Sequence, residues 1–587
     1  MNQKKPNKRE NVLELKQNEQ FLKKAYNKAL LPCVLSVLSG SINILVDGIL
    51  VGQKLGTNAL AAINFCLPVY LVLCIAGSFI VSGTAIRASD AIGKNRSGKA
   101  QRLYGMSIFW CTAASVFLTV WGLAFLKPLS RLLCFDENIA PLVAEYLGVT
   151  AAGALFKILI YIPFWFLRLD GRNGQVTLMM LIMGIGNVIL DALFLYAFDM
   201  GVFGAAMASV LSTAAACAFG FVKLCDKKSG FRFGFCVKAE GVKFREIAKA
   251  GSPSAMNNLF QTLRVTVINT LLLGYCGSET VAAFTAVNCI CAFAESVTGG
   301  VPQAASAMLG IYGGEHDNES TRLLIKRQLK SGIPCAVFFS IGIISGADFI
   351  AGAYGLNISL RFAFICLSLG MIPALINCVL SAFYNVSGRN AWADFILFLR
   401  VFSAPCASLF LLLHFGQNPW LFLFFGEIVT LIFWFAATGI FHKKLSRFLL
   451  LDTSLEKSGN VINFSVSCDA QSICGASGKI TDFCADNGMS LKQTMKISLA
   501  LEEIMTLISA KNESAAMAGF DLRVYSLQGV IGIRIRYGGN GFNPLSYADD
   551  DEEYLGIRLI EGMCEQALYQ RTFGANTVQI FVEGGIP

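Results

Sequence analysis

Two carboxylates and one amide stand inside long apolar stretches of this chain. Asp47 lies near one end of the stretch 29–52, and Asn187 and Asp191 lie in the stretch 175–197. A carboxylate at the bilayer centre costs about 2.5–3.5 kcal/mol on insertion scales, so each must face protein or water. Asn187 and Asp191 are four residues apart and share one face of a helix. The three residues predict a cation or proton site.

Simpler interpretations stay open for each of these residues. Asp47 could be a helix-end residue at the headgroup level, and Asn187 and Asp191 could form a hydrogen bond between helices. Other charges in apolar stretches could be structural pairs, could lie at misplaced boundaries, or could take part in transport. These charges are Lys157, Arg264, Glu295, Asp394, Arg400 and Glu427. We retain Arg264, Glu295, Arg400 and Glu427 as candidate intramembrane transport charges.

The elements that must position these residues are membrane helices. The chain is 55% hydrophobic and 15% charged, whereas soluble domains carry about 25% charged residues. We therefore expect an all-α polytopic membrane part with twelve transmembrane helices. The apolar stretches lie near 29–50, 60–83, 103–126, 141–166, 175–197, 203–224, 250–274, 281–310, 331–347, 359–385, 391–413 and 420–441.

The distribution of lysine and arginine predicts the orientation of these helices. With the N-terminus inside, the inside loops and tail hold 28 basic residues and the outside loops hold 4. Basic loops remain cytoplasmic, so both termini should be cytoplasmic in a multi-pass protein of the cell membrane. Residues 1–28 form a lysine-rich tail without a signal peptide. The basic excess follows from this orientation and requires no nucleic acid. The scattered cysteines fit free thiols in a reducing compartment.

The chain contains an internal repeat. Pro32, Gly56 and Ala61-Ala62 recur 221 residues later, and Gly171-Arg172-Asn173 recurs 217 residues later. Each half holds six apolar stretches, so both halves have the same orientation in the membrane. We expect bundles at 29–224 and 250–441, joined by a basic cytoplasmic linker at 225–249. Two parallel six-helix repeats around a central cleft are typical of an alternating-access transporter.

The two halves differ in chemistry. Asp47 aligns with Ile268, and Asn187 and Asp191 align with Ala404 and Ser408. The fold therefore does not require carboxylates at these positions. This asymmetry favours a cation or proton site in the first bundle only.

Three segments resemble the MATE (multidrug and toxic compound extrusion) family. They are VDGILVGQKLGTNALAAINFCLPV at 46–69, the stretch 168–212 with GIGNVILDALF, and GSPSAMNNLFQTLRVTVINTLLLGYCGSETVAAF at 251–284. The resemblance covers residues 20–442. It implies a cation site made of Asp47, Asn187, Asp191 and Ser209, the last in place of the usual threonine. It also implies efflux of small amphipathic or cationic substrates in exchange for Na⁺ or H⁺.

A soluble domain should follow a linker at 442–458. Residues 455–587 hold 10 Lys and Arg against 16 Asp and Glu. Alternating apolar residues predict strands at 461–466, 520–528, 529–537 and 576–583, and helices are expected near 468–486, 490–510 and 555–567. An α/β sandwich at 459–587 results.

This domain resembles the GHKL-type ATP-binding domain of anti-sigma-factor kinases. The likeness rests on ISLALEEIMTLISA at 497–510, RYGGNGFNP at 536–544 and the stretch 555–583. Leu507 replaces the family's Mg²⁺-binding Asn, and Tyr537 replaces its adenine-reading Asp. The family residues that remain are Glu503, Gly539, Gly541, Gly556 and Gly574. We expect a degenerate domain with poor ATP binding and no ATPase or kinase activity. GASGKIT at 475–481 is not a P-loop. It lacks the first glycine of that motif at the required spacing, and Ile480 occupies the position of the Mg²⁺-binding Ser or Thr.

Three functions fit these features. The first is a cation-coupled multidrug efflux antiporter with a regulatory or interaction module, which needs no cofactor beyond its coupling ion. The second is a membrane sensor whose tail binds a cytoplasmic partner, such as an anti-anti-sigma factor. The third is a flippase for lipid-linked substrates from the same superfamily. Ion flux measured with the Asp47 and Asp191 variants would distinguish the first from the others.

Overall fold

The computed structural model describes residues 8–94, 96–133, 139–226, 229–237, 243–353, 359–437, 460–512, 519–527, 529–547, 566–572 and 575–583. The chain divides into two compact units. One comprises Lys28–Asp317 with Ile325–Lys443, and the other comprises Met1–Asn27, Asn318–Leu324 and Lys444–Pro587. Each unit is described below by itself.

The first half of the membrane unit consists of helices only. Its longest element, α1 (Lys8–Gly93), covers the first two expected apolar stretches. Ser36 accepts a hydrogen bond from Arg168, and Arg168 lines one small cavity together with Ala85 and Ser89. The two ends of the α1 membrane stretch therefore lie close together, and α1 folds back on itself. The other elements are α2 (Ser97–Ala124), α3 (Leu126–Leu133), α4 (Ala140–Ala152), α5 (Ala154–Leu159), α6 (Tyr161–Leu169), α7 (Asn173–Asp191), π-helical η1 (Ala192–Ala197) and α8 (Gly201–Leu224).

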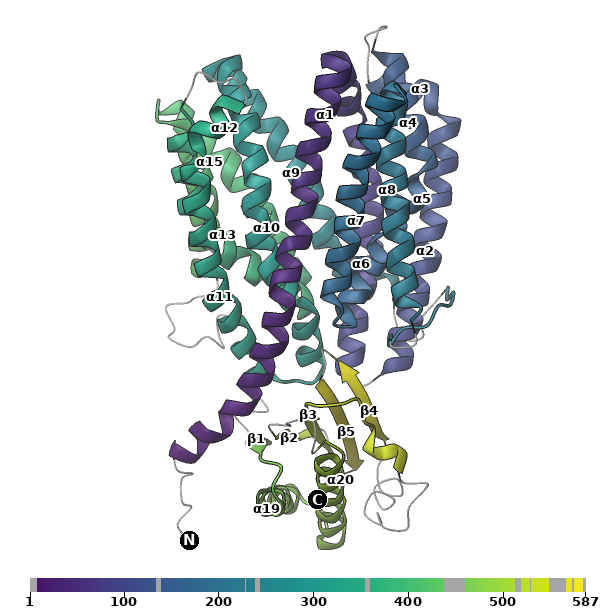
Figure 1. Cartoon of the computed structure of the whole chain (residues 1–587). Helices are drawn as coiled ribbons and strands as arrows, with labels where there is room; N and C mark the ends of the chain where they lie inside the picture. Colours follow the sequence, from purple (N-terminus) through teal and green to yellow (C-terminus); the bar gives the residue numbers. More distant parts are fainter. Residues whose placement is uncertain are drawn as a thin grey trace. The chain divides into compact units, whose positions relative to one another are not determined.

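The second half also consists of helices only (Figure 1). Figure 1 places α2 and α4–α8 on one side of the membrane unit and α9–α13 on the other. The elements are α9 (Phe244–Cys276), α10 (Ser278–Gly314), α11 (Asn318–Ser345), α12 (Ala347–Ala353), α13 (Arg361–Val386), α14 (Asn390–Leu397), π-helical η2 (Phe398–Ser403), α15 (Ala404–His414), 3₁₀-helical η3 (Pro419–Leu421) and α16 (Phe422–Ala437).

The two halves share local geometry at the repeated Gly-Arg-Asn sequence. Gly171 and Gly388 have φ angles of 75° and 76°, in the left-handed region that favours glycine. Arg172 and Arg389 each donate a backbone hydrogen bond of 2.8 Å to the residue five positions earlier. The same turn therefore ends one helix and starts the next in both halves.

Nine helices of the described residues are long and apolar enough to cross a membrane, or ten if the bent pair Ala140–Ala152 and Ala154–Leu169 forms one span. The expected spans at 29–50 and 281–310 fall on α1 and α10, some of whose side chains lie outside the described residues. The chain is thus a multi-pass helical membrane protein, and the count of twelve stays a prediction.

The C-terminal unit contains a five-stranded antiparallel sheet with the order β1-β2-β3-β5-β4. Alternate residues of the strands pack against helices, so Leu522, Val524, Ile533 and Ile535 lie in the core with Ile504 and Ile508. The elements are β1 (Val461–Val466), α19 (Ala470–Asp486), α20 (Leu491–Lys511), β2 (Phe520–Leu527), β3 (Val530–Tyr537), 3₁₀-helical η5 (Pro544–Tyr547), β4 (Gln566–Thr572) and β5 (Ala575–Glu583).

One expected helix is partly wrong. The sequence predicts a helix near 555–567, but Gln566 and Ala567 begin strand β4, which pairs with β5 along its whole length. Ala567 and Tyr569 pack against the core, and this period of two is the pattern of a strand. Residues 548–565 lie outside the described residues.

Candidate functional site

The first-half polar site is built on α7. Asn187 Nδ2 donates to Asp191 Oδ2 at 2.9 Å, and both side chains are buried. Their spacing of one turn brings them onto one face. The α-helix ends at Asp191, and the π-helical turn η1 follows directly. Single π turns are rare, and a large share of them lie at functional sites. Here the π turn directly follows the predicted site residue Asp191.

Ser209 lies on the neighbouring helix α8 at the same depth. A Cβ placed on Gly186 of α7 would lie 3.6 Å from Ser212 Cβ of α8. The two helices are connected by η1 and run antiparallel, so Ser209 lies level with the segment between Asn187 and Asp191. Ser209 Oγ accepts a hydrogen bond of 3.1 Å from Lys157 Nζ of α5. The structure therefore brings three of the four predicted residues to one depth.

Asp47, the fourth residue of this predicted site, falls on α1. Its side chain lies outside the described residues. Its contact with Asn187, Asp191 and Ser209 stays a prediction.

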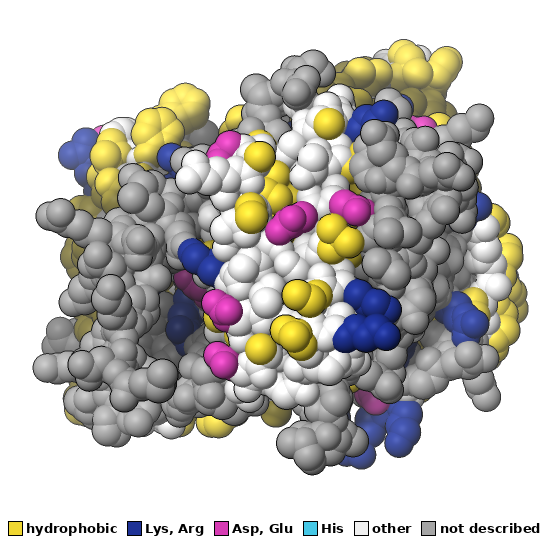
Figure 2. Space-filling model, turned by 90° about the horizontal axis from the view of Figure 1, so that it is seen from below, with side chains coloured by type: hydrophobic (Ala, Val, Ile, Leu, Met, Phe, Trp, Pro, Cys, Tyr) yellow, Lys and Arg dark blue, Asp and Glu magenta, His cyan; other side chains and the backbone are white. Residues whose placement is uncertain are grey.

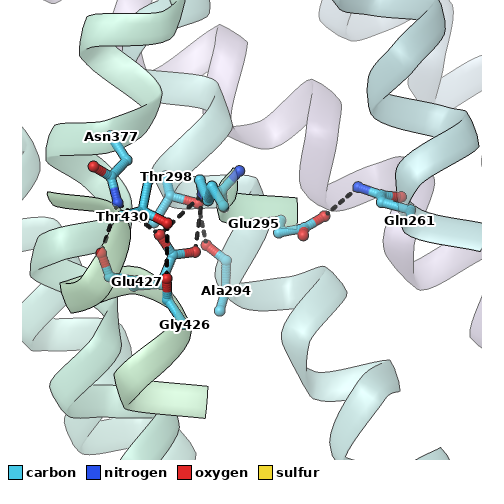
Figure 3. A network of polar contacts seen from close by, with 9 residues as sticks. Gln261, Ala294, Glu295, Thr298, Asn377, Gly426, Glu427 and Thr430 are labelled. Atoms are coloured by element: carbon cyan, nitrogen blue, oxygen red, sulfur yellow. Dashed lines mark hydrogen bonds and ion pairs between the residues drawn. The ribbon is translucent and has the colours of Figure 1, made fainter. Parts of the chain in front are cut away.

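The second half holds a larger polar network around Glu427 of α16. Arg400 Nε donates to Glu427 Oε1 at 2.9 Å and to Oε2 at 3.1 Å. Asn377 Nδ2 of α13 donates to Glu427 Oε2 and to the Glu427 backbone oxygen, both at 3.0 Å (Figure 3). Arg400 lies in the π-helical turn η2. The network thus joins three helical segments through one part-buried ion pair.

Glu295 of α10 forms the second part of this network. Its Oε2 accepts a hydrogen bond of 3.2 Å from Gln261 Nε2 of α9, and Figure 3 shows this pair beside the Glu427 group. A cavity of about 60 Å³ is lined by Arg264, Glu295, Arg400 and Glu427 together. The four candidate transport charges therefore surround one small cavity. Asp394 accepts a hydrogen bond of 2.7 Å from Ser252 instead, which is a contact between α14 and α9.

A larger cavity of about 350 Å³ lies between the two halves of the membrane unit. Val37, Ile86 and Trp165 line it from the first half. Most of its wall comes from the second half, where polar groups alternate with small apolar ones. These polar groups are Ser254, Asn257, Gln261, Glu295, Thr298, Gln303, Ser306, Ser381, Asn385 and Arg400. Such a lining could hold an amphipathic molecule, with Glu295 as an acceptor for a positive group.

In the C-terminal unit the glycine-rich segment after β3 is held by its own neighbours. Asn512 Oδ1 accepts a hydrogen bond of 3.0 Å from the Asn540 backbone N–H, and Asn576 Nδ2 donates to the Asn540 backbone oxygen at 2.9 Å. A Cβ on Gly539 would clash with Asn512, and one on Gly541 would clash with Arg571. These side chains fill the space beside the segment.

Tyr537 is fully buried and donates from its hydroxyl to the Phe542 backbone oxygen at 2.6 Å. Burial raises the pKa of this phenol. Glu503 lies on α20, whereas Gly556 and Gly574 lie outside the described residues. GASGKIT lies inside α19, so it forms no phosphate-binding loop. In the described part of the chain, no cluster of three His, Cys, Asp or Glu residues could hold a metal ion.

Sequence reasoning left Lys157 open as a structural or transport charge, without naming a partner for it. It did not single out Gln261, Asn377 or Asn512, so Lys157, Gln261, Asn377 and Asn512 were placed by the structure. A polar side chain in an apolar stretch was a signal for the first three. Asn512 had no such signal, because it lies in a soluble domain where amides are common.

Comparisons with known proteins find similarity over part of this chain. Residues 32–197 match the MatE family model. The probable multidrug resistance protein YoeA of Bacillus subtilis is 25% identical over 314 residues, which are 52% of this chain and 66% of that protein. An FAD transporter of Shewanella oneidensis is 27% identical over 241 residues, or 40% and 53% of the two chains. The multidrug export protein MepA of Staphylococcus aureus is 25% identical over 253 residues, or 43% and 55%. The chain thus spans between about half and two thirds of the length of these relatives.

Solved structures show the same fold. An outward-facing MATE family transporter of the MOP superfamily has a TM-score of 0.66 at 20% identity, covering 75% of this chain and 99% of that one. A MATE protein in complex with MaL6 has a TM-score of 0.66 at 21% identity, covering 75% and 100%. The membrane unit therefore has the MATE fold.

Proposed function

We propose that this chain is a cation-coupled efflux transporter of the MATE type, which exports small amphipathic or cationic molecules in exchange for Na⁺ or H⁺. The observation that carries this proposal is the cavity of about 350 Å³ between the two halves, with the Glu295 carboxylate in its wall. A ligand site shared by two repeats is what alternating access requires. The relatives' names, multidrug resistance and multidrug export proteins, support the same class of substrate.

Ion coupling is assigned in this proposal to the first half. The Asn187–Asp191 pair is buried and lies at the depth of Ser209. A buried carboxylate is stabilised when it binds a proton or a cation. Together with Asp47, the pair would couple the packing of α7 and α8 to the ion that is bound.

The C-terminal domain is proposed to be a regulatory or interaction module. The contacts of Asn512 and Tyr537 with the glycine-rich segment support a domain that does not bind ATP. Figure 2 shows acidic, basic and apolar side chains together on the face of the chain seen from below. A cytoplasmic protein partner for residues 459–587 is part of this proposal.

The test is ion movement in everted membrane vesicles during substrate transport. The proposal expects substrate-dependent H⁺ or Na⁺ flux that is lost in Asp47→Asn and in Asp191→Asn. Asp199→Asn is the matched control, because Asp199 is an exposed carboxylate with a φ of 49°, which asparagine also tolerates. Flux that survives both substitutions would show that the coupling assignment is wrong.

A further inference from the structure

The polar site of the first half contains an ammonium group of the protein itself. Lys157 Nζ lies 3.1 Å from Ser209 Oγ and 5.1 Å from the centroid of the Tyr70 ring. The Lys157 side chain is only 8% exposed. A buried lysine is rare unless it is paired, so this cation is held in place by the groups around it.

The backbone fixes where this ammonium can reach. Helix α5 begins after Gly153, and a Cβ at that glycine would clash with the Val210 side chain of α8. Helices α5 and α8 therefore touch at Val210, next to Ser209. Lys157 lies one turn after Gly153, so its extended side chain spans the short distance to the serine hydroxyl.

The ammonium also lies at the depth of the predicted carboxylate. Gly186 of α7 faces Ser212 of α8, and in an antiparallel pair Ser209 is then level with Ile189. Ile189 lies between Asn187 and Asp191. Described groups near the ammonium include Ser209 on α8 and Tyr70 and Cys74 on α1. Asp191 lies on α7, at a similar depth.

This arrangement does not fit a sodium ion at Ser209. Na⁺ is a hard cation and needs lone pairs of oxygen atoms directed at it. The Ser209 oxygen already accepts a hydrogen bond from Lys157, and two positive charges a few ångströms apart repel strongly in a low-dielectric interior. The Ser209 hydroxyl that a coupling Na⁺ would need is therefore already bonded to a cation of the protein itself, the Lys157 ammonium.

We infer that Lys157 takes the place of a bound Na⁺ at Ser209 and makes transport by this chain independent of Na⁺. This inference rests on the proposed function, because it concerns the choice of coupling ion. The proposed function allows Na⁺ or H⁺ as the coupling ion, and this inference excludes Na⁺, so H⁺ remains. Lys157 is then the residue that determines ion specificity.

The experiment uses the purified full-length protein. Binding of radioactive Na⁺ is measured by scintillation proximity, and uptake of a fluorescent organic cation is measured in proteoliposomes with a Na⁺ gradient or a pH gradient. Lys157→Met removes the charge and keeps the length of the side chain, and Lys157→Gln is a polar second variant. Lys54→Met is the control, since it removes a cation of α1 that pairs with Asp199.

The wild-type protein and Lys54→Met should bind no Na⁺ above background, whereas Lys157→Met or Lys157→Gln should bind it severalfold above background. A wild-type protein that binds Na⁺ would overturn the inference, and so would monodisperse Lys157 variants that both bind none. Wild-type uptake that responds to neither gradient would refute the proposed function instead. In that case the binding measurement still decides whether Lys157 excludes Na⁺.

Discussion

At the scale of single residues, the polar groups of the membrane unit occur in bonded sets. Asn187 bonds to Asp191, Lys157 to Ser209, and Arg400 to Glu427. The free energy cost of burying a charge is recovered only when its partners are well placed. Each pair therefore contributes to stability and is also a candidate for function. A substitution must be tested for its effect on stability and on transport separately.

The Arg400–Glu427 pair should behave as one unit in stability measurements. Removing one partner leaves the other part-buried without its hydrogen-bonded ion pair, so Glu427→Gln and Arg400→Gln should each lower the free energy of unfolding by about 1–3 kcal/mol. The double variant should cost less than the sum of the two. Thermal unfolding of the detergent-solubilised protein measures this coupling. Additive effects would mean that the pair contributes nothing as a pair.

A pH effect is expected at the start of α19 in the C-terminal unit. Hydrogen bonds from Ser472 hold the pKa of Asp469 below its ordinary value. The folded-state pKa is thus below the unfolded value of about 3.9. The cap stabilises the helix above that pH, and the stabilisation is lost as the pH falls through the folded-state pKa.

Asp469→Ala should therefore speed amide hydrogen exchange in the first turn of α19 at neutral pH. The difference from the wild-type protein should shrink in acid. Asp482→Ala, an exposed carboxylate of the same helix, is the control and should change little. Equal effects of the two substitutions at neutral pH would show that the cap has no specific role.

At the scale of elements, close helix contacts join the two halves. A Cβ on Gly83 of α1 would clash with the Ile247 backbone oxygen of α9, and one on Gly251 of α9 would clash with the Phe79 backbone oxygen of α1. Small residues let the backbones approach this closely. The crossing of α1 and α9 lies next to the large cavity, whose wall includes Ile86 and Pro253.

Gly251→Ala should consequently separate α1 from α9. Overpacking costs about 1–3 kcal/mol, so the melting temperature and substrate uptake should both fall. Gly98→Ala in α2 is the matched control, because no atom lies within 4 Å of its added Cβ. Thermal unfolding and uptake of both variants provide the comparison. Similar values for the two would contradict the close packing at Gly251.

At the scale of the whole molecule, a membrane unit with the MATE fold is followed by an α/β domain. The membrane unit and the C-terminal unit each have their own core, and the sheet of the latter has helices α19 and α20 against its apolar residues. Energy for transport would come from an ion gradient under the proposed function. The C-terminal domain is then free of any requirement to hydrolyse ATP.

ATP should neither bind tightly to the full-length protein nor be turned over. The expected affinity for a fluorescent ATP analogue with Mg²⁺ is weak, because Asn512 and Tyr537 hold the glycine-rich segment and Leu507 offers no ligand for the metal. Tight binding of the analogue that ATP displaces would contradict this expectation, and so would a release of phosphate that depends on the C-terminal domain.

The features that depend on a local pattern of residues could be predicted from the sequence. Apolar length predicted the membrane helices, the period of two predicted β1, β2, β3 and β5, and the isolated polar residues Asn187 and Asp191 marked a buried pair that the structure contains. The strand β4 was missed at Gln566 because its alternation is short and its pairing partner β5 decides its conformation.

The contacts between side chains far apart in the sequence depend on how the helices pack. Lys157 and Ser209 are 52 residues apart, and Arg400 and Glu427 are 27 apart on separate helices. Hydropathy specifies that a helix crosses the membrane but not how it is rotated or which neighbour it touches. The Asn187–Asp191 pair was therefore predictable from its spacing, whereas the contact between Lys157 and Ser209 was not.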